Sequence, residues 1–201
     1  MTQSPPEQFG KYELLKRLAF GGMAEIFLAR LRGEAGFSKQ LVVKRILPQF
    51  GEDEHFVKMF IDEAVLAAHI NHPNVVQIYD FGSTDKVYFI AMEFVDGADL
   101  RQILRSQRKQ DRRLSFADIA AIGEGAAAGL ASAHTARDPD GNALQIVHRD
   151  VSPHNIMVGK SGDVKVMDFG IAKAEVRATK TATGTIKGKV AYMAPEHGAG
   201  E

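Results

Sequence analysis

Two oppositely charged residues, Lys44 and Glu63, occupy positions that the surrounding pattern reserves for apolar side chains. Glu63 lies at helical spacing with Phe60 and Ala67, so the three residues share one helix face. An unpaired carboxylate buried on that face would be strongly destabilising. Lys44 ends the apolar run at residues 41–43 and can supply the compensating cation. The pattern predicts a buried ion pair; the alternative is an outward-facing helix with both charges in water.

A second group of polar residues is typical of metal and phosphate chemistry. The run HRDVSPHN occupies residues 148–155, and the tripeptide DFG follows at residues 168–170, beyond a short apolar strand pattern. Asp150, Asn155 and Asp168 together offer the hard oxygen ligands that Mg²⁺ prefers. Asp150 can alternatively orient or deprotonate a nucleophile. Each string alone is a weak signal, but their joint occurrence in this order is a strong one.

These side chains must be positioned by a β-rich first half and a helix-rich second half that meet near Gly97. Alternating β-branched and aromatic residues between turns predict strands over residues 11–20, 24–30, 39–46, 75–81, 86–94, 156–158 and 164–167. Helical periodicity and capping residues predict helices over 53–70, 99–107 (capped by Asp99) and 116–136 (capped by Ser115), the last as a buried helix.

Composition excludes several classes of protein. The 201 residues carry 25 Lys plus Arg against 25 Asp plus Glu, and no Cys. The balance argues against general attraction to nucleic acid or membranes, and without Cys no disulfide or thiolate metal site can form. No apolar run is long enough to span a bilayer. We expect a disordered tail at residues 1–9, a solvated surface at the basic segment 101–113 and a cytoplasmic setting, with a membrane anchor elsewhere in the parent protein left open.

The order of these motifs resembles the protein kinase family, specifically the bacterial Ser/Thr kinases of eukaryotic (Hanks) type. The resemblance extends from about Phe9 to Glu196. Its landmarks are Lys44 with Glu63 nineteen residues later, the segment HPNVV at 72–76, the HRD loop with Asn155, the DFG tripeptide and APE at 194–196. It implies an α+β, bilobal kinase fold: a β-rich N-lobe with one key helix over about 10–96 and an incomplete α-rich C-lobe over about 97–201.

The resemblance also implies roles for individual residues. Lys44 would hold the ATP phosphates and Glu63 would fix that lysine. Asp150 would accept or orient the substrate hydroxyl proton, while Asn155 and Asp168 would ligate Mg²⁺, or Mn²⁺ in its place. Further nucleotide contacts would come from the gatekeeper Met92, the backbone of Glu93 and Val95, the adenine-sandwiching Leu18, Ile26, Val42 and Met157, and Asp99 near the ribose.

By the same resemblance, residues 168–196 form the activation segment, with autophosphorylation candidates at Thr179, Thr181, Thr183 and Thr185. The implied partners are ATP and proteins with Ser or Thr acceptors, with no nucleic acid and no membrane contact from this segment. Dimerisation would allow phosphorylation in trans.

The phosphate-binding loop departs from the family's G-x-G-x-x-G pattern, which falls here on Ala19, Gly21 and Ala24. The loop residues Phe20, Gly21, Gly22 and Met23 still predict a tight turn between two strands. Alanine can replace glycine where φ is negative. We therefore expect a functional loop with weaker nucleotide affinity.

The catalytic loop has Ser152 where Ser/Thr kinases usually place Lys, and Lys189 stands where they usually place Thr. We hypothesise that the two residues have exchanged roles, with Lys189 supplying the cation and Ser152 the hydroxyl. The alternative is two independent losses.

The family fold continues past Glu196 through several helices that this chain lacks, so we expect a truncated domain that exposes apolar surface and is inactive by itself. A catalytically silent pseudokinase or scaffold is the main alternative, although the five principal site residues are all intact. A small-molecule kinase of the aminoglycoside or choline type is a weaker alternative, since those families lack the Thr-bearing segment and APE.

Overall fold

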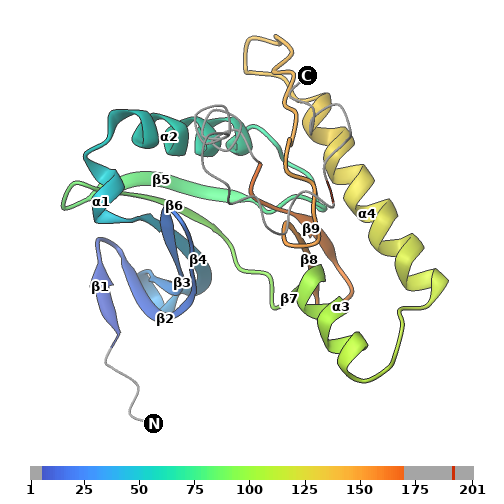
Figure 1. Cartoon of the computed structure of the whole chain (residues 1–201). Coiled ribbons are helices and arrows are strands. Elements are labelled where there is room, and N and C mark those ends of the chain that lie inside the picture. Colours follow the sequence, from blue (N-terminus) through green and yellow to red (C-terminus); the bar gives the residue numbers. More distant parts are fainter. Residues whose placement is uncertain (1–5, 170–191, 193–201) are drawn as a thin grey trace, which may run out of the picture. The chain divides into compact units, whose positions relative to one another are not determined.

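The chain folds into two compact units, seen in a computed structural model that describes residues 6–169 and 192. The first unit comprises Met1–Ala68 and Val76–Phe94, and the second comprises His69–Val75 and Val95–Glu201. The first unit is rich in strands, and the second holds the helices α3 (Leu100–Lys109) and α4 (Phe116–His134) (Figure 1). This α+β architecture matches the expected division into a β-rich and a helix-rich part.

A six-stranded antiparallel sheet, in the order β1-β2-β3-β4-β6-β5, forms the first unit. Its strands are β1 (Glu7–Phe9), β2 (Tyr12–Phe20), β3 (Ala24–Arg32), β4 (Ser38–Ile46), β5 (Ile78–Thr84) and β6 (Val87–Glu93). A 3₁₀ turn, η1 (Glu34–Gly36), joins β3 to β4, and the helices α1 (Pro48–Gly51) and α2 (Glu54–Ala68) follow β4. The predicted helix over 53–70 is thus confirmed.

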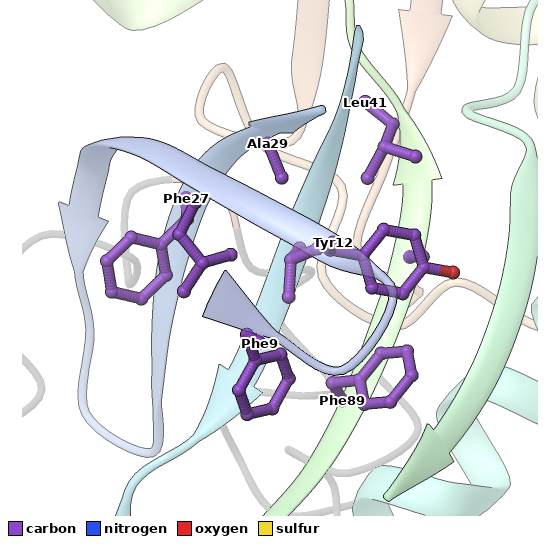
Figure 2. Packing of buried hydrophobic residues seen from close by; sticks show 9 residues of the cluster. Phe9, Tyr12, Phe27, Ala29, Leu41 and Phe89 are labelled. Atoms are coloured by element: carbon purple, nitrogen blue, oxygen red, sulfur yellow. The ribbon is translucent and has the colours of Figure 1, made fainter. Parts of the chain in front are cut away.

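The sheet curls around an aromatic and aliphatic core. Figure 2 shows Phe9, Tyr12 and Phe89 close together, and both of the other rings meet Phe89 edge to face at about 5.5 Å. The Tyr12 hydroxyl donates to Asp80 at 2.7 Å and so ties β2 to β5, two strands that are not neighbours in the sheet. Burial, and secondarily the Asp80 carboxylate, raise the pKa of Tyr12, which keeps this hydroxyl protonated as a donor.

The prediction of a disordered tail over residues 1–9 was wrong for the last three residues. Glu7–Phe9 pairs with β2 in antiparallel register as β1. Phe9 is buried in the core cluster, and this burial of a large aromatic ring compensates the chain entropy lost in ordering so short a strand.

The strand predicted over residues 75–81 begins only at Ile78. Val75 instead forms a parallel bridge with Val166, and Asn74 both donates to the Val164 carbonyl and accepts from Val166 N–H at 2.8 Å. These bonds place His69–Val75 in the second unit. Sequence analysis predicted a single boundary between the two units, near Gly97, and did not predict that this earlier segment belongs to the second unit.

A three-stranded antiparallel sheet, β7-β8-β9, organises the second unit. Its strands are β7 (Gly97–Asp99), β8 (Ile156–Gly159) and β9 (Val164–Val166), and its helices are α3 (Leu100–Lys109) and α4 (Phe116–His134). Both predicted caps are confirmed: Asp99 accepts from Gln102 N–H at 2.7 Å, and Ser115 forms a reciprocal capping box with Asp118.

Helix α4 is far more exposed than the predicted buried helix. Only Ala126, Gly129 and Ala133 are buried, while Phe116 is 93% exposed. The buried stripe packs against β9 and Asn74, and a Cβ at Gly129 would lie 2.5 Å from the Asn74 carbonyl oxygen. Apolar composition alone did not determine burial here, because burial also requires elements to cover the opposite face. Among the described residues, no helix combines the length and apolar character needed to cross a membrane.

Candidate active site

The predicted ion pair between Lys44 and Glu63 is present. Lys44 Nζ lies 2.6 Å from Glu63 Oε1, and each side chain is only 13% exposed. Alternation along β4 explains this placement: Leu41 and Val43 face the core, so Lys44 projects from the opposite face of the sheet. Helix α2 presents Glu63 to it, with the Phe60 ring 5.9 Å from the ammonium. The sheet and the helix together therefore fix the position of one ammonium group.

The loop between β2 and β3 is the expected tight turn. Gly21 N–H donates to the Ala24 carbonyl at 2.9 Å, and Met23 O accepts from Leu47 N–H. Neither Ala19 nor Ala24 is among the described residues with positive φ, so alanine is accommodated at both positions without backbone strain. Phe20, the last residue of β2, is exposed, and Gly22 in the turn has open space around it.

The residues predicted to contact adenine and ribose are distributed over both units, and within each unit the strand register pairs them. In the first unit Ile26 lies opposite Lys44, and Val42 lies opposite the buried Met92. Leu18 is half exposed on β2, and Glu93 N–H donates to the Gln77 carbonyl.

In the second unit Met157 on β8 lies opposite Asp99 on β7, and Asp96 and Lys160, which flank these two strands, form an ion pair at 2.8 Å. Val95 is buried at the start of this unit. Both carboxylate oxygens of Asp99 already accept from Gln102, so its predicted ribose contact would share an atom with the helix cap.

Asp150 is held by its own loop. It is buried, and the Asn155 side-chain amide donates both to its backbone carbonyl at 2.8 Å and to its carboxylate at 3.0 Å. Its N–H donates to His148 Nδ1 at 3.2 Å. The preceding residue, Arg149, has a left-handed backbone with φ of 60°, a conformation uncommon for a non-glycine residue and often found at functional sites.

Met167 connects this catalytic loop to the DFG segment through its backbone alone. Its N–H donates to the Asn155 carbonyl at 2.9 Å, and its carbonyl lies 3.1 Å from His148 Nε2. Because Nδ1 of His148 accepts from Asp150, the ring proton is on Nε2 and points to Met167. Burial lowers the pKa of His148, which favours the neutral ring that this arrangement requires. The ring also contacts Phe169, with centroids 4.7 Å apart.

Asn155 and Asp168 carry the side-chain oxygen types that suit a divalent cation. The Asn155 amide nitrogen is committed to Asp150, so its oxygen is the atom that can serve a metal. Asp168 directly follows Met167 and has φ of 53°, a second left-handed residue in the site. The Asn155 amide oxygen and the Asp168 carboxylate are hard donors of the kind that Mg²⁺ or Mn²⁺ prefers. These residues therefore fit the predicted metal.

Ser152 is buried in the same loop, 3% exposed, and its Oγ has no hydrogen-bond partner among the described residues. Its proposed counterpart Lys189 lies outside them, as do the four candidate threonines and most of the activation segment after Phe169, including APE.

Two contributors to the site were not predicted from the sequence. Met167 acts through backbone groups, so its side-chain type carries no signal. Asn74 was noticed only as part of a matching segment, yet it anchors β9, which leads into Met167.

Comparison with known proteins identifies the family of the chain. The protein kinase domain family matches residues 12–198. The tyrosine-protein kinase MasK of Myxococcus xanthus is 45% identical over 195 residues, which cover 97% of this chain and 30% of MasK. The serine/threonine-protein kinase PrkC of Bacillus subtilis is 35% identical over 191 residues, covering 95% of this chain and 27% of PrkC. The chain thus spans less than a third of either relative.

Solved structures show the same fold. The Mycobacterium tuberculosis PknI kinase domain superposes with a TM-score of 0.66 at 28% identity, covering 85% of this chain and 62% of that one. The apo form of PpkA-294 superposes with a TM-score of 0.67 at 19% identity, covering 89% of this chain and 65% of that one. The match over residues 12–198, together with the paired Lys44 and the clamped Asp150, shows that the chain belongs to the protein kinase domain family.

Proposed function

We propose that this chain is the catalytic domain of an ATP- and Mg²⁺-dependent protein kinase that phosphorylates Ser or Thr hydroxyls, including its own. The observation that carries the proposal is the state of Asp150. Its buried carboxylate accepts from the Asn155 amide and its backbone N–H donates to His148, and this loop is hydrogen-bonded to Met167, the residue before Asp168. Such a network fixes the position of a carboxylate that can act as a base. We further propose that the first unit is the N-lobe and the second unit the C-lobe.

Each unit supplies a different part of the reaction. Lys44, fixed by Glu63, offers a positive charge for the α- and β-phosphates, and the β2–β3 turn offers backbone N–H groups. Asp150 orients the substrate hydroxyl and takes its proton as the oxygen–phosphorus bond forms and the bond from the γ-phosphorus to the β,γ-bridging oxygen breaks. Asn155 and Asp168 would hold the Mg²⁺, which neutralises phosphate charge when bound. ADP and a phosphoprotein are the products.

The acceptor hydroxyl is assigned to Ser or Thr because the catalytic loop lacks the Ala-Arg pair typical of tyrosine kinases. PrkC, which is named a serine/threonine kinase, supports this assignment, whereas MasK is named a tyrosine kinase. Identification of the phosphorylated amino acid distinguishes these two acceptors.

The test is transfer of label from [γ-³²P]ATP, with [α-³²P]ATP as a control for tight nucleotide binding. We expect the full-length protein to incorporate label with Mg²⁺ and not with EDTA, and hydrolysis to yield phosphoserine or phosphothreonine. Phosphotyrosine alone would overturn the acceptor assignment. No incorporation by a folded protein that binds ATP would instead favour the pseudokinase alternative.

We also propose that Ser152 and Lys189 have exchanged roles. The support is the buried Ser152 Oγ, because a buried hydroxyl without a partner is costly unless a bound group satisfies it. We expect Ser152→Lys and Lys189→Thr each to lower kcat/KM at least about tenfold. The double variant should recover most of that loss. Additive losses in the double variant would overturn the exchange.

A further inference from the structure

Helix α3 carries the strongest concentration of charge in the described part of the chain. Six cations lie within residues 101–113, accompanied by a single acidic residue, Asp111. All six are exposed. We call this set the basic stripe: Arg101, Arg105, Arg108, Lys109, Arg112 and Arg113. Since the whole chain is neutral, the remainder has an excess of acidic residues and the stripe is a local feature.

The stripe differs from the other described arginine clusters in having no carboxylate partners. On the first unit's sheet, Arg17, Arg30, Arg32 and Arg45 each lie within 4 Å of a glutamate oxygen. Among the described residues, no cation of the basic stripe makes an ion pair. Six like charges without internal compensation repel one another. Binding of a negatively charged ligand would lower the electrostatic free energy of this surface.

The periodicity of α3 places the four cations that it carries on one side of the helix, and Arg112 and Arg113 follow its C-terminal end. Arg101, Arg105 and Arg108 are four and three residues apart, which puts them on one helix face. Leu100, Ile103 and Gln107, the half-buried positions, form the opposite face toward β7 and β8. From Arg101 to Lys109 the stripe is about 12 Å long, comparable to about four residues of extended peptide.

The stripe begins at the catalytic loop. Arg101 N–H donates to the Pro153 carbonyl at 3.0 Å, three residues after Asp150 and within the same unit. A protein segment that delivers a hydroxyl to Asp150 therefore comes close to the start of this helix. A lipid surface or a nucleic acid has no comparable reason to meet the stripe at this end.

We propose that the basic stripe is a substrate-recognition surface that selects Ser or Thr residues flanked by Asp or Glu. This inference rests on the proposed kinase function and adds a substrate class to it. The partner is an acidic, extended protein segment, with its acidic residues on one side of the acceptor over about four positions.

The test compares Ser peptides that carry Glu on the N-terminal side, Glu on the C-terminal side, or Gln at the same positions. The full-length protein should phosphorylate one Glu series with a kcat/KM about tenfold or more above the Gln peptide, the factor expected for several exposed ion pairs formed together. The preference should shrink at high salt, since these charges are screened. The triple variant Arg105→Gln/Arg108→Gln/Lys109→Gln should abolish it.

A control variant removes three exposed lysines of the first unit that make no ion pair among the described residues: Lys16→Gln/Lys58→Gln/Lys86→Gln. It should keep the preference. Equal phosphorylation of all peptides, or equal loss in both variants, would overturn the inference while leaving the kinase function intact. If no peptide is phosphorylated, the kinase function fails separately. Binding of the Glu peptide to the wild type and to the triple variant, measured by fluorescence anisotropy, then tests the basic stripe directly. Weaker binding by the triple variant would support the inference. Binding of the protein to anionic vesicles but not to the peptide would overturn it.

Discussion

Replacing Asp150 with asparagine is expected to lower kcat/KM for phosphoryl transfer about 10³-fold while leaving the fold intact. Asparagine has nearly the same shape, and its amide oxygen can still accept the hydrogen bond from Asn155 at the 3.0 Å seen for the carboxylate. What is lost is the negative charge that orients the hydroxyl and receives its proton. The measurement is steady-state transfer to a Ser peptide, alongside the Kd for ATP and the melting temperature.

The expected pattern distinguishes catalysis from binding. ATP affinity should change little, because no nucleotide contact is assigned to Asp150. Asp140→Asn is the matched control, since it removes an exposed carboxylate from the same unit and should leave kcat/KM unchanged. A near-normal rate for Asp150→Asn would contradict its role, and loss of melting cooperativity would show that the carboxylate is structural.

The sequence predicted those parts of the site where residue type and burial conflict. Glu63 stood out because a carboxylate on an apolar face requires a partner, and Lys44 was the available cation. The HRD segment stood out because its polar residues lie between an apolar pair and an apolar strand pattern, and DFG stood out because it follows a second strand pattern. In each case the energetic cost of burying polarity is visible in the residue type itself.

The parts that sequence analysis missed depend on contacts that residue type does not encode. Val75 is β-branched, as strand residues often are, but it bridges to Val166 within the second unit and does not join the six-stranded sheet. The predicted strand therefore started too early. Met167 works through its N–H and carbonyl, which every residue but proline possesses. Helix α4 has an apolar sequence, yet whether it is buried depends on what packs against it.

The Lys44–Glu63 pair should show strong coupling in a double-mutant cycle. We expect Lys44→Met to lower kcat/KM about 10²-fold and Glu63→Gln somewhat less, since Glu63 acts only by positioning the ammonium. The double variant should be no worse than Lys44→Met alone, because Glu63 has no further role once its partner is gone. Additive losses would contradict this dependence and assign Glu63 a separate function.

Substitutions of Lys44 and Glu63 should affect stability in a different pattern from activity. Each single substitution leaves the other group in a site where the wild-type side chains are 13% exposed, and should cost about 1–3 kcal/mol in the free energy of unfolding. The apolar pair Lys44→Met/Glu63→Leu should regain much of that stability without regaining activity. Lys160→Met, which removes the exposed pair with Asp96 at 2.8 Å, should change stability by less than about 1 kcal/mol. Recovery of stability without activity would show that the buried pair is kept for positioning an ammonium group, since an apolar pair would serve the fold as well.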